Sequence, residues 1–89
     1  VLGAGAAGIA AAIGAARAGR PVLLVERRRE LGGLATSAEV GTVCGLYHTG
    51  PGAARWLHDG FAREFGERLV ERSGARPLAY RSVLHFLPY

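Results

Sequence analysis

The stretch VLGAGAAG (residues 1–8) places Gly3, Gly5 and Gly8 in the pattern G-x-G-x-x-G. The apolar pair before the first glycine is typical of a strand end, and the Ala-rich segment 6–19 predicts a helix that starts within the pattern. In this setting the first glycine permits a tight turn, the second lets a ligand approach the backbone, and the third lets the helix pack closely. The stretch therefore predicts a turn that binds the diphosphate of a dinucleotide at a helix N-terminus.

The segment PVLLVE (residues 21–26) predicts a second, buried parallel strand, reached after Gly19 ends the helix. Strand, helix and strand form a right-handed βαβ unit. The fold class that we expect is α/β, with a partial Rossmann-like βαβ dinucleotide-binding domain whose parallel sheet is flanked by helices. Glu26 follows Gly8 by 18 residues (26 − 8), which places its carboxylate beside the turn, where it can accept hydrogen bonds from ribose hydroxyls.

The charges after this strand bear on the kind of dinucleotide. The carboxylate of Glu26 would repel a 2′-phosphate, whereas Arg27 and Arg28 could accept one. The same arginines could instead be solvated or stack near an adenine. The glycine pattern and the acid leave NAD and FAD as equal alternatives.

The segment VERRRELGGLAT (residues 25–36) separates these alternatives by a resemblance. Gly32 and Gly33 follow Glu26 by six and seven residues, which resembles the fingerprint of the glutathione-reductase-like flavoproteins with two dinucleotide-binding domains. The longer stretch GGLATSAEVGTVCGLY resembles the FAD-dependent oxidoreductase family. The resemblance covers residues 1–50 well and residues 53–89 weakly.

This resemblance implies FAD as the cofactor and an oxidoreductase that moves hydride or electrons between a small-molecule substrate and FAD. It places the first three glycines at the diphosphate, Glu26 at the adenosine ribose, the glycine pair near both, and the Thr36 hydroxyl as a donor. The residues that we expect to bind the cofactor are Gly3, Gly5, Ala6, Ala7, Gly8, Glu26, Arg27, Gly32, Gly33 and Thr36. Two alternatives are an NAD-dependent dehydrogenase domain and a non-catalytic dinucleotide-binding module.

The rest of the chain predicts loops over residues 32–52, with one short strand within residues 40–47. Residues 53–72 predict an amphipathic helix that Gly74 ends, and residues 80–89 predict a strand. The apolar stripe of this helix consists of Leu57, Phe61, Phe65 and Leu69. Two pairs at i,i+4 spacing, Asp59 with Arg63 and Glu64 with Arg68, lie away from the stripe.

Composition bears on whether the chain binds nucleic acid, spans a membrane or holds a metal ion. The 89 residues carry a net charge of +4, and all eleven basic residues are arginines, clustered only in ERRRE between two acids. Nucleic acid is therefore not an expected partner. No segment predicts a membrane span or a metal site. Because only two apolar residues precede Gly3, we expect residues 1–89 to be the N-terminal part of one longer FAD/NAD(P)-binding domain, inactive alone and located in the cytoplasm.

The sequence identifies no catalytic residue. Cys44 could act in redox chemistry or tether the flavin, and His48 could act as an acid, a base or a tether. The alternative for Cys44 is a small buried apolar residue. For Trp56, packing is favoured over stacking on a flavin.

Overall fold

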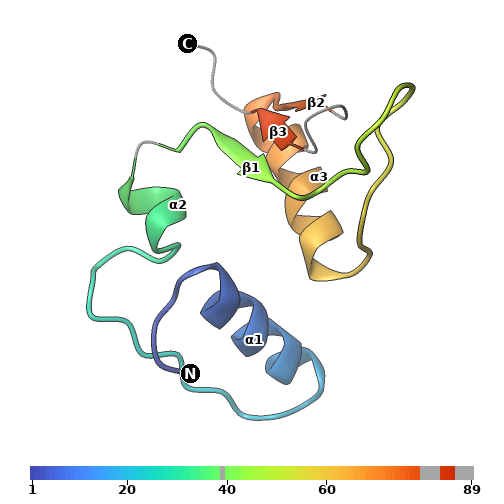
Figure 1. Ribbon diagram of the computed structural model, residues 1–89. Coiled ribbons are helices and arrows are strands. Elements are labelled where there is room, and N and C mark those ends of the chain that lie inside the picture. Colours follow the sequence, from blue (N-terminus) through green and yellow to red (C-terminus); the bar gives the residue numbers. More distant parts are fainter. Residues whose placement is uncertain (39, 79–82, 86–89) are drawn as a thin grey trace. The chain divides into compact units, whose positions relative to one another are not determined.

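The computed structural model describes residues 1–38, 40–78 and 83–85, and side chains up to Pro77 (Figure 1). The chain forms two compact units, Val1–Val40 and Gly41–Tyr89.

The first unit contains α1 (Ala6–Arg17), which confirms the predicted helix and ends two residues earlier than expected. Gly19 has a φ of 74°. The Gly19 and Arg20 N–H groups donate to the carbonyls of Ala16 (3.0 Å) and Ala15 (3.1 Å). This pattern is a Schellman motif, which glycine permits at the left-handed position.

The two segments on either side of α1 run parallel, but they form a bridge and not a strand pair. Leu2 pairs with Val25, the Val25 N–H donates to Val1 O (2.9 Å), and the Gly3 N–H donates to Val25 O (2.8 Å). The prediction of a strand over residues 21–26 is therefore wrong in its extent. Its partner segment leaves the ladder at Gly3, whose φ of 88° starts the turn.

The parallel sheet of the expected fold is present among the described residues only as two isolated parallel bridges. The first joins Leu2 to Val25, and the second joins Gly5 to Gly32. A short helix, α2 (Leu34–Ser37), follows the glycine pair in a segment where the sequence predicted loops.

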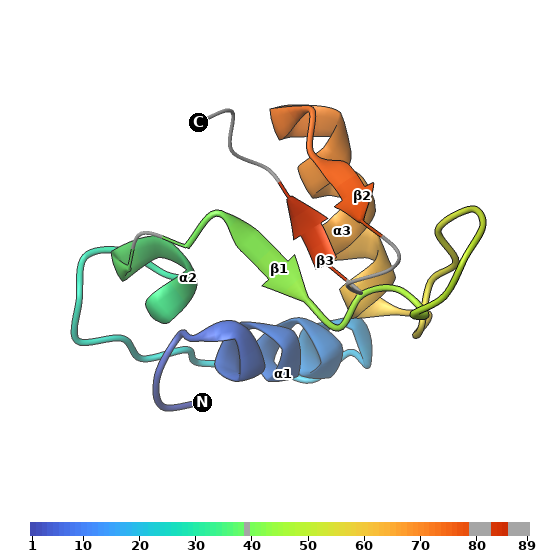
Figure 2. The same cartoon turned by 45° about the horizontal axis from the view of Figure 1, so that its top comes forward.

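The second unit contains a three-stranded antiparallel sheet in the order β1-β3-β2 (Figure 2). The strands are β1 (Thr42–Cys44), β2 (Arg76–Leu78) and β3 (Val83–His85). Val43 and Pro77 both stand opposite Leu84. β1 confirms the short strand expected within residues 40–47, and β2 was not predicted. The strand predicted over 80–89 is described only at β3, and the rest of that prediction lies outside the described residues.

The helix of the second unit, α3 (Phe61–Ser73), is shorter than the predicted helix over residues 53–72. It begins after Gly60, whose φ is 79°, and ends at Gly74, whose φ is 68°. The Gly74 N–H donates to Val70 O (3.0 Å), which confirms Gly74 as the end of the helix.

The apolar face of α3 also differs from the predicted stripe. Leu57 lies outside the helix, and both Leu57 and Phe65 are 40 % exposed. The residues of α3 that pack on the core formed by Leu46, Tyr47 and Ala75 are Ala62, Leu69 and Val70. Leu69 of the predicted stripe thus packs on the core, but the buried face of α3 also contains Ala62 and Val70, which spacing by fours did not include.

The packing of Trp56 explains why the buried face of α3 differs from the predicted stripe. Its ring lies 4.6 Å from that of Tyr47, between centroids, and it packs against the backbone of α3 at the buried Gly66. A β-carbon at Gly66 would lie 2.6 Å from two atoms of the indole ring. Gly66 thus makes room for a large side chain from the preceding loop, and Trp56 packs as expected.

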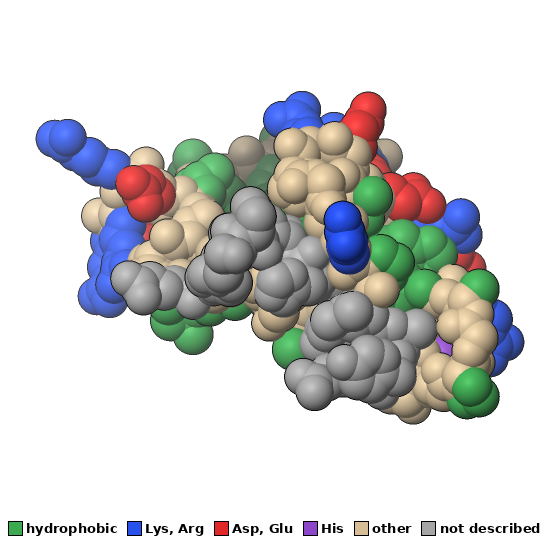
Figure 3. Space-filling view, turned by 90° about the horizontal axis from the view of Figure 1, so that it is seen from above, with side chains coloured by type: hydrophobic (Ala, Val, Ile, Leu, Met, Phe, Trp, Pro, Cys, Tyr) green, Lys and Arg blue, Asp and Glu red, His purple; other side chains and the backbone are tan. Residues whose placement is uncertain are grey.

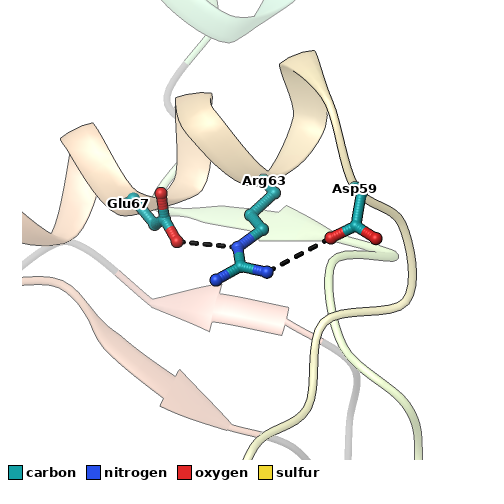
Figure 4. A network of polar contacts seen from close by, with 3 residues as sticks. All are labelled: Asp59, Arg63 and Glu67. Atoms are coloured by element: carbon teal, nitrogen blue, oxygen red, sulfur yellow. Dashed lines mark hydrogen bonds and ion pairs between the residues drawn. The ribbon is translucent and has the colours of Figure 1, made fainter.

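Salt bridges run along the exposed side of α3. The Arg63 Nε donates to Glu67 Oε1 (2.8 Å) and its guanidinium pairs with Asp59 Oδ1 at 3.2 Å (Figure 4). These acids raise the pKa of Arg63, and the hydrogen bond that Arg63 donates to Glu67 is the larger cause. Arg68 pairs with Glu64 at 3.0 Å, so both predicted pairs are confirmed. On the face drawn in Figure 3, acidic side chains lie beside arginines.

Candidate functional site

Glycine suits each of its three positions in the first turn for a different structural reason. Gly3 has a φ of 88°, which glycine adopts readily. A β-carbon at Gly8 would lie 1.9 Å from Gly3 O, so only glycine lets α1 pack this closely on the turn. At Gly5, an added β-carbon would meet no atom of the described residues within 4 Å. The space beside Gly5 is therefore open to a ligand.

The turn leads directly into the N-terminus of α1. Gly5 is the N-cap residue, no side chain caps this end, and the first turn carries no acid. The N–H groups at the start of a helix lack intrahelical acceptors, and the helix dipole makes this end partly positive. Ala6 and Ala7, which we expected to bind the cofactor, are exposed in this first turn. The site can thus receive an anionic group such as a diphosphate.

Glu26 lies beside the turn, as its spacing predicted. Its Oε2 accepts a hydrogen bond from the Ala4 N–H (2.7 Å), and its Oε1 accepts one from the Arg28 N–H (2.9 Å). The Ala4 and Arg28 N–H groups lower the pKa of Glu26, with Ala4 the larger cause. A carboxylate has about four acceptor positions, so lone pairs remain for ribose hydroxyls.

The glycine pair meets the first turn. The Gly32 N–H donates to Ala4 O (2.7 Å). Gly33 has a φ of 59°, and a β-carbon there would lie 3.0 Å from the Gly5 α-carbon. The structure therefore brings together Gly5, Gly8, Glu26 and the glycine pair, although they are far apart in the sequence.

Thr36 lies in α2, where its hydroxyl hydrogen has acceptors within the protein. Its Oγ1 lies 2.8 Å from Leu31 O and 3.3 Å from Gly33 O, both of which can accept the hydroxyl hydrogen. A β-carbon at Gly32 would lie 2.5 Å from the Thr36 methyl carbon. In this arrangement Thr36 supports the loop of the glycine pair.

A cavity of about 440 Å³ opens beside the turn and Glu26. Its lining has an apolar part and a polar part, and consists of Leu2, Gly3, Val25, Glu26, Arg27, Arg28, Glu30, Gly33, Leu34 and Ser37. Leu2 is 87 % and Leu34 is 78 % exposed. Six of the lining residues were not among those expected to bind the cofactor, and only their closeness to Glu26 or to the two glycine motifs could have indicated them: Leu2, Val25, Arg28, Glu30, Leu34 and Ser37.

Cys44 and His48, the two residues considered for chemistry, lie in the second unit, on either side of the buried Tyr47. Cys44 is a free, exposed cysteine, so the alternative of a buried apolar residue is wrong. Tyr47 is only 3 % exposed, and its burial and the charge of Glu67 raise its pKa. His48 is exposed, and its backbone N–H donates to Arg55 O (2.9 Å).

Among the residues that the structure describes, no three His, Cys, Asp or Glu side chains gather as a group that could hold a metal ion. None of the helices described is long and apolar enough to cross a membrane.

Comparison with known proteins agrees with this geometry. The model of the family described as FAD dependent oxidoreductase matches residues 1–87. Neither the comparison with curated proteins nor that with solved structures gave a match. FAD is the cofactor of this family. The match includes both glycine motifs and Glu26, and spans nearly the whole sequence, so the chain belongs to the FAD dependent oxidoreductase family.

Proposed function

We propose that residues 1–89 are the N-terminal part of a Rossmann-like FAD-binding domain in a flavin-dependent oxidoreductase. The observation that carries this proposal is the meeting of the open glycine turn, Glu26 and the glycine pair at one cavity. The family match supports the cofactor. The two parallel bridges, Leu2 to Val25 and Gly5 to Gly32, support a parallel sheet in the same domain.

The residues present fit the adenosine diphosphate half of FAD. The uncapped start of α1 offers N–H donors to the diphosphate, and the absent side chain of Gly5 leaves room for it. Glu26 offers acceptors to the ribose hydroxyls. The apolar lining of the cavity, formed by Leu2, Val25 and Leu34, offers a surface for the adenine ring.

Arg27 and Arg28 line the same cavity. Their guanidinium groups offer a flat cationic surface to adenine and positive charge near the diphosphate. The role of this chain is thus to bind and orient the cofactor. When bound, FAD supplies the acceptor for hydride or electrons from a small-molecule substrate.

The test is the visible absorption spectrum of the purified protein, followed by analysis of the cofactor released on denaturation. We expect the near-ultraviolet and blue bands of a flavin, with FAD as the released molecule. Glu26→Ala should lower the FAD content, whereas Glu71→Ala, at an exposed glutamate on α3, should not. A colourless protein that takes up NAD and not FAD would instead assign the site to a nicotinamide dinucleotide.

A further inference from the structure

Ala4 is the point where the two cofactor motifs are joined. It is 0 % exposed and lies between Gly3 and Gly5. Its N–H donates to Glu26 Oε2 (2.7 Å), and its carbonyl accepts from the Gly32 N–H (2.7 Å). Both backbone polar groups of one turn residue are thus held by partners more than 20 positions further along the chain.

These two hydrogen bonds orient two peptide planes. A trans peptide is planar, with its C=O and N–H groups pointing in opposite directions. The bond from Gly32 to Ala4 O therefore directs the Gly5 N–H away from Gly32. The bond from the Ala4 N–H to Glu26 likewise directs Gly3 O away from Glu26. Gly3 O faces Gly8, where only a missing β-carbon leaves space for it.

Ala4 has a glycine on each side, and the turn therefore needs these two hydrogen bonds to hold one conformation. Gly3 and Gly5 have more conformational freedom in the unfolded chain than other residues, so ordering them costs more entropy. A hydrogen bond to a charged acceptor is stronger than one to a neutral group. The carboxylate of Glu26 is thus a suitable acceptor for holding a turn of this composition.

We propose that Glu26 and Gly32 are positioning residues that hold the glycine turn in its diphosphate-binding conformation before the cofactor arrives. The inference rests on the proposed function, because it concerns the same turn. It gives Glu26 a second role, besides accepting hydrogen bonds from the ribose. That role acts through the protein backbone and needs no ribose.

The first experiment uses the cofactor-free protein and measures amide hydrogen exchange by NMR. We expect the Ala4 amide to be protected without FAD, while the Ala6 and Ala7 amides exchange freely. Glu26→Gln should speed exchange at Ala4 by about tenfold or more, because one N–H then loses a charged acceptor. Amides in the middle of α1 should keep their protection, which verifies that the variant folds. Glu71→Gln is the matched control, and Ala4 should exchange there as in the wild type.

The second experiment uses inorganic pyrophosphate, which contains the diphosphate but no ribose. If Glu26 acts only on ribose, Glu26→Gln leaves pyrophosphate binding unchanged, or strengthens it, because a nearby negative charge is removed. If Glu26 positions the turn, the same variant weakens pyrophosphate binding by about threefold or more, because the N–H donors lose their orientation. Only the positioning role therefore predicts weaker pyrophosphate binding in Glu26→Gln.

The outcomes separate this inference from the proposed function. Protection of Ala4 that arises only after FAD is added overturns the inference, and this result needs no variant. So does an unchanged Ala4 exchange rate in Glu26→Gln, or pyrophosphate binding that is not weakened. A protein that protects Ala4 through Glu26 but takes up no FAD would retain the positioning role and overturn the cofactor assignment.

Discussion

The α-carbon of Gly8 faces Gly3 O so closely that an added β-carbon would lie 1.9 Å from the oxygen. Gly8→Ala must therefore move α1 away from the turn. Overpacking of this kind typically costs about 1–3 kcal/mol, and here the obstacle is backbone. Urea denaturation should show the loss, and the flavin content should fall with it.

Gly14 offers a matched control in the same helix. It is exposed, and a β-carbon there would meet no atom of the described residues within 4 Å. Gly14→Ala should stabilise the protein by about 0.5–1 kcal/mol through helix propensity. Equal effects of the two substitutions would contradict the close packing at Gly8.

Gly5 gives a different prediction, because the space beside it is open in the protein. Gly5→Val should abolish FAD retention by occupying the space for the diphosphate, while the free energy of unfolding falls by only about 1 kcal/mol from poorer helix capping. Gly5→Ser keeps a good cap and should also reduce retention. The measurement is the ratio of flavin to protein absorbance after purification, and full retention in both variants would exclude a diphosphate at this turn.

Glu26 predicts a dependence of stability on pH. The folded-state pKa of Glu26 lies below its ordinary value of 4.5, because the Ala4 and Arg28 N–H groups bind the carboxylate. The unfolded state therefore takes up the proton first, and the contribution of Glu26 is fully present above pH 4.5. It is lost as the pH falls through the lowered folded-state pKa.

The measurement is urea denaturation of the wild type and Glu26→Gln, from about pH 7 to about pH 3. The difference in their free energies of unfolding should be constant near neutral pH and shrink in acid. Glu71→Gln should follow the wild type throughout. A difference that grows on acidification would mean that the folded state does not favour the charged form.

Gly66 tests the second unit. Alanine normally stabilises a helix relative to glycine, but a β-carbon at Gly66 would lie 2.6 Å from the indole ring of Trp56. Gly66→Ala should therefore destabilise the protein by about 1–3 kcal/mol. In a Trp56→Leu background the same substitution should cost less or become stabilising, and thermal denaturation of the four proteins measures this coupling. If the effects of the two substitutions were additive, the indole ring of Trp56 would not lie against Gly66.

The sequence predicted α1 and the roles of its glycines because both depend on local chemistry. Alanines favour helix, Gly19 permits the left-handed end, and a missing β-carbon at Gly8 is required whenever a helix packs on such a turn. The position of Glu26 was also predictable, since a helix and a returning segment bring it back to the turn. The binding roles of these residues stay predictions.

Features that depend on distant residues were not predictable. The start of α3 at Phe61, and not at residue 53, follows from Gly60 and from the packing of Trp56 on Gly66, which spacing by fours does not contain. The segment 21–26 has the composition of a strand. Its pairing, however, depends on its partner, the N-terminal segment, which turns away at Gly3. The sequence indicated only that Gly5 and Gly33 each lie near the cofactor. It did not indicate that the two residues contact each other.

The two partners of Ala4 lie on opposite sides of an exposed segment of the chain. Between Glu26 and Gly32 lie three consecutive exposed arginines at positions 27–29. A single proteolytic cut there would leave the bond to Glu26 within one peptide and make the bond to Gly32 intermolecular. The second bond would then lose the high effective concentration that a continuous chain provides. The exposed arginines thus form a short tether whose integrity keeps the glycine pair at the turn.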